Sequence, residues 1–177
     1  MTAASSITQV TVVGTGVIGN GWITRFLANG FRVVASDPDP EAEARTRDAV
    51  ERAWPSMEKM GLAEGASQDN LSFEPDLEKA LAEADFIQEN VPEREQLKRG
   101  VIASIDKHAP QEAVIASSTS GILPSTLQAD CAYHPERVIV AHPFNPVYLM
   151  PLVELVGGEK TDDHLWKRQD NFTNKWK

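Results

Sequence analysis

The sequence predicts an α/β protein with a doubly wound, mostly parallel sheet and helices on both faces of that sheet. Three observations indicate this fold. Short apolar segments rich in β-branched residues alternate with longer helix-like segments along the chain, which is the pattern of βαβ units. The first apolar segment runs directly into three glycines at G-x-G-x-x-G spacing. The second apolar segment ends at an acidic residue, Asp37.

Each expected strand is a short apolar run, as in strands that are buried on both faces of a parallel sheet. The expected strands cover residues 7–14, 31–37, 71–75, 85–92, 113–120, 137–146 and 151–158. The expected helices cover residues 17–30, about 40–60, 76–84 and 93–109. Asn29-Gly30 is a typical helix stop, and Asp76 is a candidate N-cap. Pro55 predicts a kink or break in the second helix.

The chain length of 177 residues suffices for one domain with an appendage. Residues 1–160 are expected to form that domain, and the polar segment 161–177 a helical or frayed tail. The single cysteine, Cys131, excludes an internal disulfide and fits a reducing compartment. The N-terminus shows no basic region followed by an apolar stretch, so we expect a cytoplasmic protein.

Charge and composition narrow the classes of ligand. The net charge of −9 and the lack of a clustered basic stripe argue against nucleic acid or an anionic membrane surface as partner. No apolar run approaches the roughly 20 residues that span a bilayer. The four histidines are scattered and, with one cysteine, leave no spacing typical of a metal site.

The glycine segment has the context that a dinucleotide cradle requires. Gly14 would permit the tight turn, Gly16 would let a pyrophosphate approach the backbone, and Gly19 would let helix and strand pack closely. The helix that begins near Val17 and Ile18 would offer free N–H groups and the positive end of its dipole to the phosphates. The alternative is a structural turn, but the complete βαβ context favours the cradle and a Rossmann-type fold.

Asp37 ends the second strand, where a carboxylate can accept both ribose hydroxyls. A 2′-phosphate there would meet Asp37 with Asp39 close behind, and no Arg or Lys follows immediately. The predicted cofactor is therefore NAD rather than NADP.

Further polar residues follow the ends of the later strands. His142 lies between prolines in "AHPFNP", and Glu154 lies in the apolar run "PLVELV", where an unpaired carboxylate is costly to bury. A histidine oriented by a carboxylate is a general base suited to neutral pH. Beside a nicotinamide, such a pair would take the proton of a substrate hydroxyl, which Ser120 could hold. The alternative is a structural loop histidine with Glu154 on a solvated sheet edge.

Four segments together resemble the 3-hydroxyacyl-CoA dehydrogenase family, over nearly all of residues 7–160. They are "VVGTGVIGNGW", "ENVPEREQLK", "SSTSG" and "AHPFNPVYLMPLVELVGG". Within the family, "QENVPER", "SSTSGILPS" and "HPFNPVYLMPLVE" are most similar to the L-carnitine 3-dehydrogenase branch, with the L-gulonate 3-dehydrogenase and lens crystallin branch next. The resemblance implies NAD-dependent oxidation of a small 3-hydroxy substrate, carnitine first, with L-gulonate or a 3-hydroxyacyl-CoA as alternatives.

The resemblance also implies roles for individual residues. It places catalysis and substrate binding on His142, Glu154, Ser120 and Asn145. It places Glu93 and Lys98 beside the nicotinamide, whereas the residues alone would suggest an ordinary solvated helix pair. Phe144 and Tyr148 are candidates for holding the trimethylammonium group of carnitine on an aromatic face, with core packing as the alternative. Basic residues that would favour the phosphates of coenzyme A do not cluster near His142.

One departure from the family is expected to matter. The family continues into an all-helical domain that adds a catalytic Asn, closes over the substrate and makes a homodimer. This chain stops at Lys177, and residues 161–177 do not resemble the start of that domain. We therefore expect exposed apolar surface where it would dock. A catalytically incomplete NAD-binding fragment is the alternative function, and a structural, crystallin-like role is a third.

Overall fold

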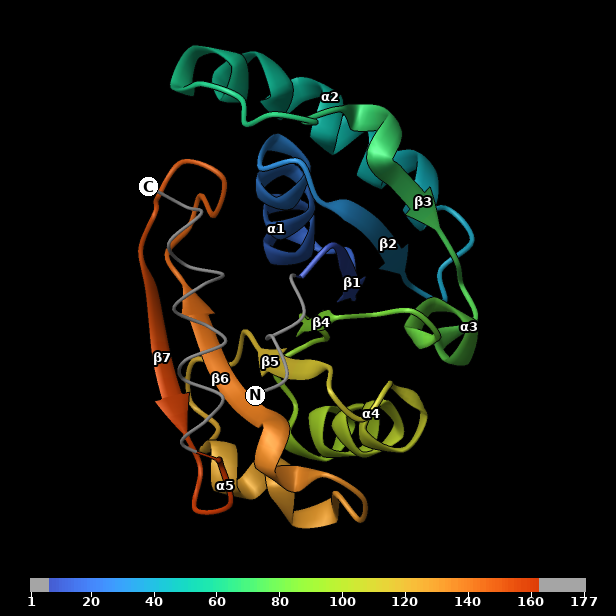
Figure 1. Cartoon of the computed structure of the whole chain (residues 1–177), viewed down its shortest axis with the longest axis vertical. Coiled ribbons are helices and arrows are strands. Elements are labelled where there is room, and N and C mark those ends of the chain that lie inside the picture. Colours follow the sequence, from blue (N-terminus) through green and yellow to red (C-terminus); the bar gives the residue numbers. More distant parts are fainter. Residues whose placement is uncertain (1–6, 163–177) are drawn as a thin grey trace, which may run out of the picture.

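The computed structural model describes residues 7–162, in which seven strands form one sheet in the order β3-β2-β1-β4-β5-β6-β7. The strands are β1 Gln9–Val13, β2 Arg32–Ser36, β3 Leu71–Phe73, β4 Phe86–Glu89, β5 Val114–Ser117, β6 Val138–Pro143 and β7 Val153–Gly157. The first six strands pair in parallel, and β7 pairs antiparallel with β6 at the edge of the sheet (Figure 1). The predicted mostly parallel α/β sheet is confirmed.

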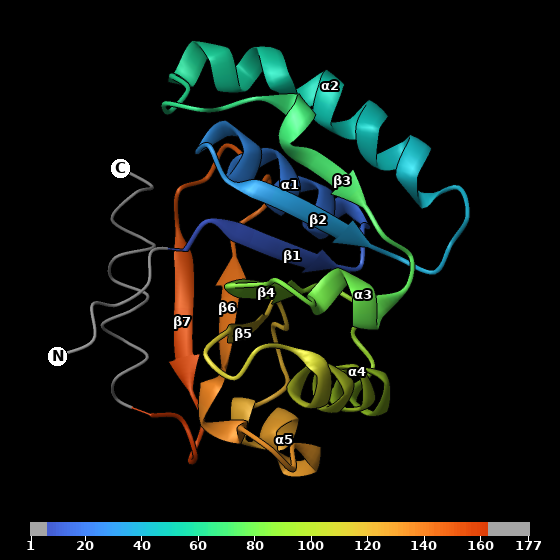
Figure 2. The same ribbon diagram turned by 45° about the vertical axis from the view of Figure 1, so that its right-hand side comes forward.

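Helices cover both faces of the sheet (Figure 2). They are α1 Val17–Ala28, α2 Ala42–Met60, α3 Leu77–Leu81, α4 Glu95–His108 and α5 Pro124–Leu127, with 3₁₀ turns at Gln68–Asn70, Gln128–Asp130 and Pro135–Arg137. On one face, Trp22 and Phe26 of α1 and Met57 of α2 pack with β-strand valines into one core cluster. On the other face, Ile105 of α4 and Leu127 of α5 belong to a second cluster. The doubly wound arrangement follows from these two cores.

The structure confirms one local prediction about the helices and contradicts another. Asp76 caps α3 as predicted, because its Oδ1 accepts the Lys79 N–H at 3.3 Å. The predicted break at Pro55 is wrong, since α2 is continuous over Ala42–Met60. The buried side chains of Trp54 and Met57, on either side of Pro55, hold both halves of α2 against the core. The four-residue helix α5 was not predicted.

Apolar side chains are exposed in the segment that joins β6 to β7. The exposed members are Phe144, Leu149, Met150 and Leu152. The expectation that apolar surface is exposed where a further domain would dock stays a prediction. The helices within residues 7–162 include none that is both long enough and apolar enough to cross a membrane. The proposed tail from residue 163 onward lies outside the described residues.

Candidate active site and cofactor cleft

The glycine turn after β1 depends on glycine for two separate reasons. Gly14 has φ +84°, and a Cβ there would come within 2.9 Å of the Asn90 carbonyl carbon. A Cβ on Gly19 would lie 2.0 Å from the Gly14 carbonyl oxygen, so α1 can approach the turn only because residue 19 lacks a side chain. A Cβ on Gly16 would meet nothing within 4 Å. Gly16 therefore faces open space, as a backbone that cradles a ligand must.

The amino-terminal end of α1 presents unused donors to that space. The Asn20 N–H donates to the Gly16 carbonyl at 2.8 Å. The N–H groups of Val17, Ile18 and Gly19 precede this first intrahelical donor, so no carbonyl within the helix accepts from them. The N-cap, Gly16, supplies no side-chain acceptor, and the first turn of α1 holds no acidic residue. This end of α1 is suited to a phosphate anion.

A cavity of about 770 Å³ opens in front of the turn. Its lining comes from the glycine loop, the end of β2, the segment after β4 and α4, and includes Gly14, Gly16, Val17, Ile18, Ser36, Asp37, Asn90, Val91 and Arg94. A crevice at the carboxyl ends of parallel strands is the usual ligand site of such sheets. The donors, the open glycine and the cavity together fit a dinucleotide. Arg94, a cation on this wall, was not among the predicted residues.

Asp37 lies at the rim of this cavity with part of its carboxylate already in use. Its Oδ2 accepts the Thr15 N–H at 2.9 Å and the Thr15 hydroxyl at 3.1 Å, and its Oδ1 accepts the Asp39 N–H at 3.1 Å. A carboxylate has about four acceptor positions, so these three hydrogen bonds leave room on Oδ1 for a ribose hydroxyl. The guanidinium of Arg45 pairs with Asp39 and Glu41. That pairing leaves little positive charge for a 2′-phosphate, in agreement with NAD.

A second cavity of about 370 Å³ adjoins the first and shares Ile18, Asn90, Val91 and Pro92 with it. Its remaining lining is Glu93, Lys98, Ser118, Ser120, His142 and Pro143. The structure therefore brings predicted residues from four separate segments around one space. Asn145 does not join them: it lies in the exposed segment after β6 and is not part of this lining.

The pairing of β6 with β7 places His142 directly opposite Glu154. The His142 Nδ1 lies 2.9 Å from Glu154 Oε2, and the two side chains are 31% and 59% exposed. Glu154 does lie on a sheet edge, as the alternative interpretation held, yet it is bonded to His142. The Phe144 ring centroid is 6.0 Å from that of His142. Tyr148 instead packs against the core and lines a different cavity, between α1 and α2.

The interpretation of Glu93 and Lys98 as a solvated helix pair is wrong. Glu93 precedes α4, which begins at Glu95, and the Lys98 side chain is only 2% exposed. The Lys98 ammonium lies 2.8 Å from Glu89 Oε1 and 3.5 Å from Glu93 Oε2. Burial alone would raise the pKa of Glu93, but the hydrogen bond from Thr119 and the charge of Lys98 outweigh it and hold that pKa below its ordinary value.

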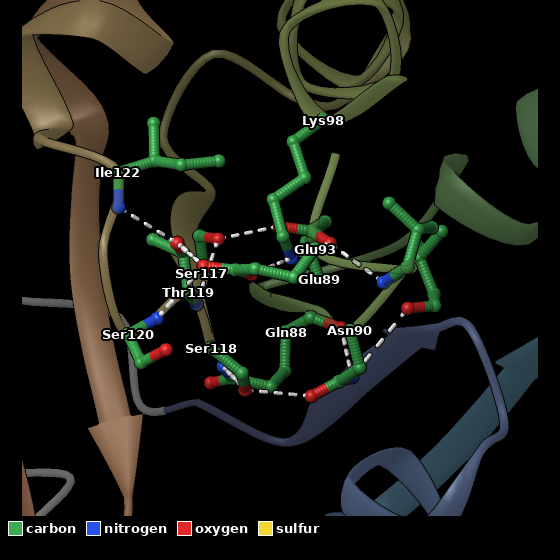
Figure 3. A network of polar contacts seen from close by, with 12 residues as sticks. Gln88, Glu89, Asn90, Glu93, Lys98, Ser117, Ser118, Thr119, Ser120 and Ile122 are labelled. Carbon is green, nitrogen blue, oxygen red and sulfur yellow. Dashed lines mark hydrogen bonds and ion pairs between the residues drawn. The ribbon is translucent and has the colours of Figure 1, made fainter. Parts of the chain in front are cut away.

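A hydrogen-bond network that was not predicted includes Ser118 and Asn90, which both line the second cavity (Figure 3). The Ser118 hydroxyl accepts from Trp22 Nε1 at 3.0 Å and Gln88 Nε2 at 2.9 Å, and it donates to Asn90 Oδ1 at 2.7 Å. Glu89 accepts from the Ser117 hydroxyl of the neighbouring strand. The signal in the sequence was the polar run 88–90 at the end of an otherwise apolar strand.

The chain matches the family model described as 3-hydroxyacyl-CoA dehydrogenase, NAD binding domain, over residues 9–177. It is 68% identical over 168 residues to an L-carnitine dehydrogenase of Bacillus cereus, covering 95% of this chain and 51% of that protein. An L-carnitine dehydrogenase of Streptomyces coelicolor is 52% identical over 161 residues, which cover 91% of this chain and 50% of the relative. The chain therefore spans about half the length of the curated relatives it matches.

Solved structures show the same family. The 3-hydroxybutyryl-CoA dehydrogenase from Escherichia coli K12 superposes with a TM-score of 0.88 at 28% identity, covering 97% of this chain and 37% of that chain. A diketoreductase structure superposes with a TM-score of 0.88 at 30% identity, covering 98% of this chain and 62% of that chain. The chain thus belongs to the 3-hydroxyacyl-CoA dehydrogenase family, and the domain that contains its cofactor cleft is that family's NAD-binding domain.

Proposed function

We propose that this chain supplies the NAD site and the general base of an enzyme that oxidises the 3-hydroxyl of L-carnitine to give 3-dehydrocarnitine. One observation carries the proposal. The His142–Glu154 pair stands at a cavity that contains Ser120 and opens onto the dinucleotide cleft at Ile18. A base, a hydroxyl-binding group and a cofactor cleft are thereby adjacent.

In this proposal each side chain has a task. Glu154 Oε2 accepts a hydrogen bond from the His142 Nδ1–H, and this tautomer leaves Nε2 with a free lone pair to take the proton of the substrate hydroxyl. Ser120 holds that hydroxyl oxygen toward the imidazole. As His142 becomes positively charged, the Glu154 carboxylate stabilises the imidazolium. NAD, when bound, supplies the acceptor for the hydride that leaves the same carbon.

Three observations support carnitine as the substrate. Relatives that are 52% to 68% identical to this chain are named L-carnitine dehydrogenase. Phe144 is 37% exposed beside His142 and offers an aromatic face for a trimethylammonium group. Lys98, the cation in the lining of the second cavity, is buried between two glutamates. It is therefore poorly placed to bind the phosphates of coenzyme A.

A second candidate function is NAD binding without turnover. It is favoured by the exposed apolar side chains between β6 and β7. In that case the remaining half of such a relative would be needed to close the cavity over the substrate.

NADH formation by the purified chain tests both functions, with L-carnitine, L-gulonate and a 3-hydroxyacyl-CoA offered separately and NADH binding measured by fluorescence. We expect NADH binding, and turnover with L-carnitine alone. Binding without turnover of any substrate would favour the second candidate. Turnover with L-gulonate or the acyl-CoA alone would overturn the assignment of carnitine.

The proposal extends to a cytoplasmic enzyme that is a homodimer at full length. Cys131 is buried, and its burial raises the pKa of the thiol to about 12, so the cysteine stays protonated and unreactive. Sedimentation of the longest natural protein that contains this chain checks the dimer, and a monomer would count against it.

A further inference from the structure

A buried carboxylate that the proposed mechanism does not use contacts Lys98, a residue that lines the second cavity. Glu89 ends β4 and is 0% exposed. Its Oε1 accepts from Lys98 Nζ at 2.8 Å and from the Val91 N–H at 2.6 Å, and its Oε2 accepts from the Ser117 hydroxyl. A buried charge is costly unless it is paired and hydrogen-bonded in this way. Glu89 thus joins three separate segments at the carboxyl edge of the sheet.

Lys98 links the buried Glu89 to the second cavity, because it pairs with Glu89 and lines that cavity. Its ammonium stands between two carboxylates, the buried Glu89 at 2.8 Å and the Glu93 carboxylate at 3.5 Å. The Glu93 side chain is 46% exposed, whereas Lys98 is 2% exposed. The shorter contact with the buried partner fixes the ammonium, and the fixed ammonium attracts Glu93 Oε2.

Glu93 in turn holds the loop that contains Ser120. Its Oε1 accepts from the Thr119 hydroxyl, from the Ser120 N–H at 3.1 Å and from the Gly121 N–H at 3.3 Å. One oxygen of Glu93 therefore faces Lys98 while the other binds the loop. Figure 3 shows this sequence of contacts from Lys98 through Glu93 to Ser120.

We propose that Glu89 is a positioning residue that fixes the Ser120 loop through Lys98 and Glu93. Without the charge of Glu89, Glu93 is the remaining carboxylate within ion-pair distance of Lys98 among the described residues. The ammonium then moves toward Glu93 and draws the carboxylate away from the loop amides. The role of Ser120 in catalysis rests on the proposed function, but the effect on the loop does not.

Amide hydrogen exchange of Ser120 and Gly121, followed by NMR, tests the proposal directly. The variant is Glu89→Gln, which keeps the size of the side chain and removes its charge. The amide oxygen can still accept from the Val91 N–H, and the amide NH2 can donate to the Ser117 hydroxyl in place of the oxygen that accepts from it. The matched control is Glu95→Gln, the same change at an exposed glutamate that pairs with Arg99. We expect both loop amides to exchange about tenfold faster in Glu89→Gln, because one charge-assisted hydrogen bond is lost.

The proposal requires that faster exchange in Glu89→Gln be confined to the loop amides of Ser120 and Gly121. Exchange of core amides such as those of Val12 and Ile105 should stay unchanged in Glu89→Gln, and the control should match the wild type throughout. Unchanged loop amides in Glu89→Gln would overturn the proposal. Equal acceleration of loop and core amides would also overturn it, since it would mean that Glu89 only stabilises the fold.

A second pair of variants keeps the test decisive if Glu89→Gln fails to fold. Lys98→Met removes the ammonium but leaves the buried Glu89 carboxylate without its cation. Glu89→Gln with Lys98→Met removes both charges, so the double variant leaves neither member of the pair as an unpaired buried charge. Each should release the loop, and the double variant should exchange no faster than Lys98→Met alone because the residues act in series. A protected loop in the double variant, or additive effects, would overturn the route through Lys98.

The turnover number with L-carnitine is a second measurement, independent of amide exchange. With L-carnitine, we expect Glu89→Gln to lower kcat about tenfold to a hundredfold, as small displacements of an oriented group do. A wild-type protein without turnover would count against the proposed function alone. The exchange of Ser120 and Gly121 would then still decide the role of Glu89.

Discussion

The cofactor cleft and the His142–Glu154 pair lie along the same edge of the sheet but are formed by different kinds of groups. The cleft is made of backbone: a glycine with positive φ, a second glycine in contact with the turn, and free N–H groups at a helix start. The His142–Glu154 pair, the proposed base and its partner, is made of two partly exposed side chains on the last two strands. NADH binding should therefore be sensitive to a single methyl group added at the glycine turn. Turnover should be sensitive to the removal of the functional group of His142 or Glu154.

The largest effect is expected from Gly19→Ala. Its Cβ would lie 2.0 Å from the Gly14 carbonyl oxygen, so α1 or the turn must move, and we expect destabilisation of about 3 kcal/mol or more with loss of NADH binding. The matched change is Gly16→Ala, where the Cβ would meet nothing within 4 Å. That variant should unfold as the wild type does but bind NADH more weakly. Thermal unfolding and NADH fluorescence distinguish the two, and equal destabilisation would contradict the comparison.

His142→Ala should separate binding from turnover. Loss of a general base lowers rates about 10²- to 10⁴-fold, whereas the glycine turn and α1 are untouched. We therefore expect kcat with L-carnitine to fall by that range while the NADH dissociation constant stays within about twofold, since the base makes no part of the phosphate cradle. Intact turnover in His142→Ala would falsify the mechanism.

Glu154→Gln should have a smaller effect than the loss of the base itself. The amide can still contact His142, but it provides no negative charge for the imidazolium. Because the Glu154 side chain is 59% exposed, water partly replaces that charge, and we expect kcat to fall about tenfold to a hundredfold. Glu159→Gln, the same change at another exposed glutamate, serves as the control. A loss as large as that of His142→Ala would show that Glu154 does more than orient and stabilise the imidazole.

The smallest effect concerns stability in acid, far from both sites. Burial would raise the pKa of Asp85, but hydrogen bonds from Gln9 and Thr8 and the charge of Arg32 outweigh it and lower that pKa. A carboxyl whose pKa is lower in the folded state stabilises the fold above its ordinary pKa, and that contribution disappears as pH falls through the lower, folded value. Asp85→Asn should therefore cost about 1 kcal/mol at pH 7 and much less near pH 2.

Urea unfolding at the two pH values measures this difference. Glu83→Gln, a change at an exposed glutamate, is the control and should leave the free energy of unfolding unchanged at both. An equal loss for Asp85→Asn at both pH values would show that the carboxylate charge is not what stabilises the start of β1.

The sequence predicted features that depend on local backbone geometry better than features that depend on long-range packing. The glycine turn was predictable because positive φ and close helix approach both require glycine at fixed spacing. The burial of Lys98 was not predictable in this way. Two residues five positions apart, such as Glu93 and Lys98, read as an ordinary solvated helix pair, and the ion pair of Lys98 with Glu89 of β4 forms only in the folded sheet. Glu89 was missed for the same reason, since its partner Ser117 lies 28 residues away.

The antiparallel pairing of β6 and β7 has a consequence for how the protein fails on heating. Strand β7 stands last in the sheet order of the described residues, and an edge strand opens locally at lower free energy than central strands do. Glu154, the proposed partner of the base, lies on that strand, whereas the glycine turn follows β1, which lies four strands further into the sheet. Warming should therefore abolish oxidation first and cofactor binding only later, so the protein would pass through a state that still carries its cofactor but performs no chemistry.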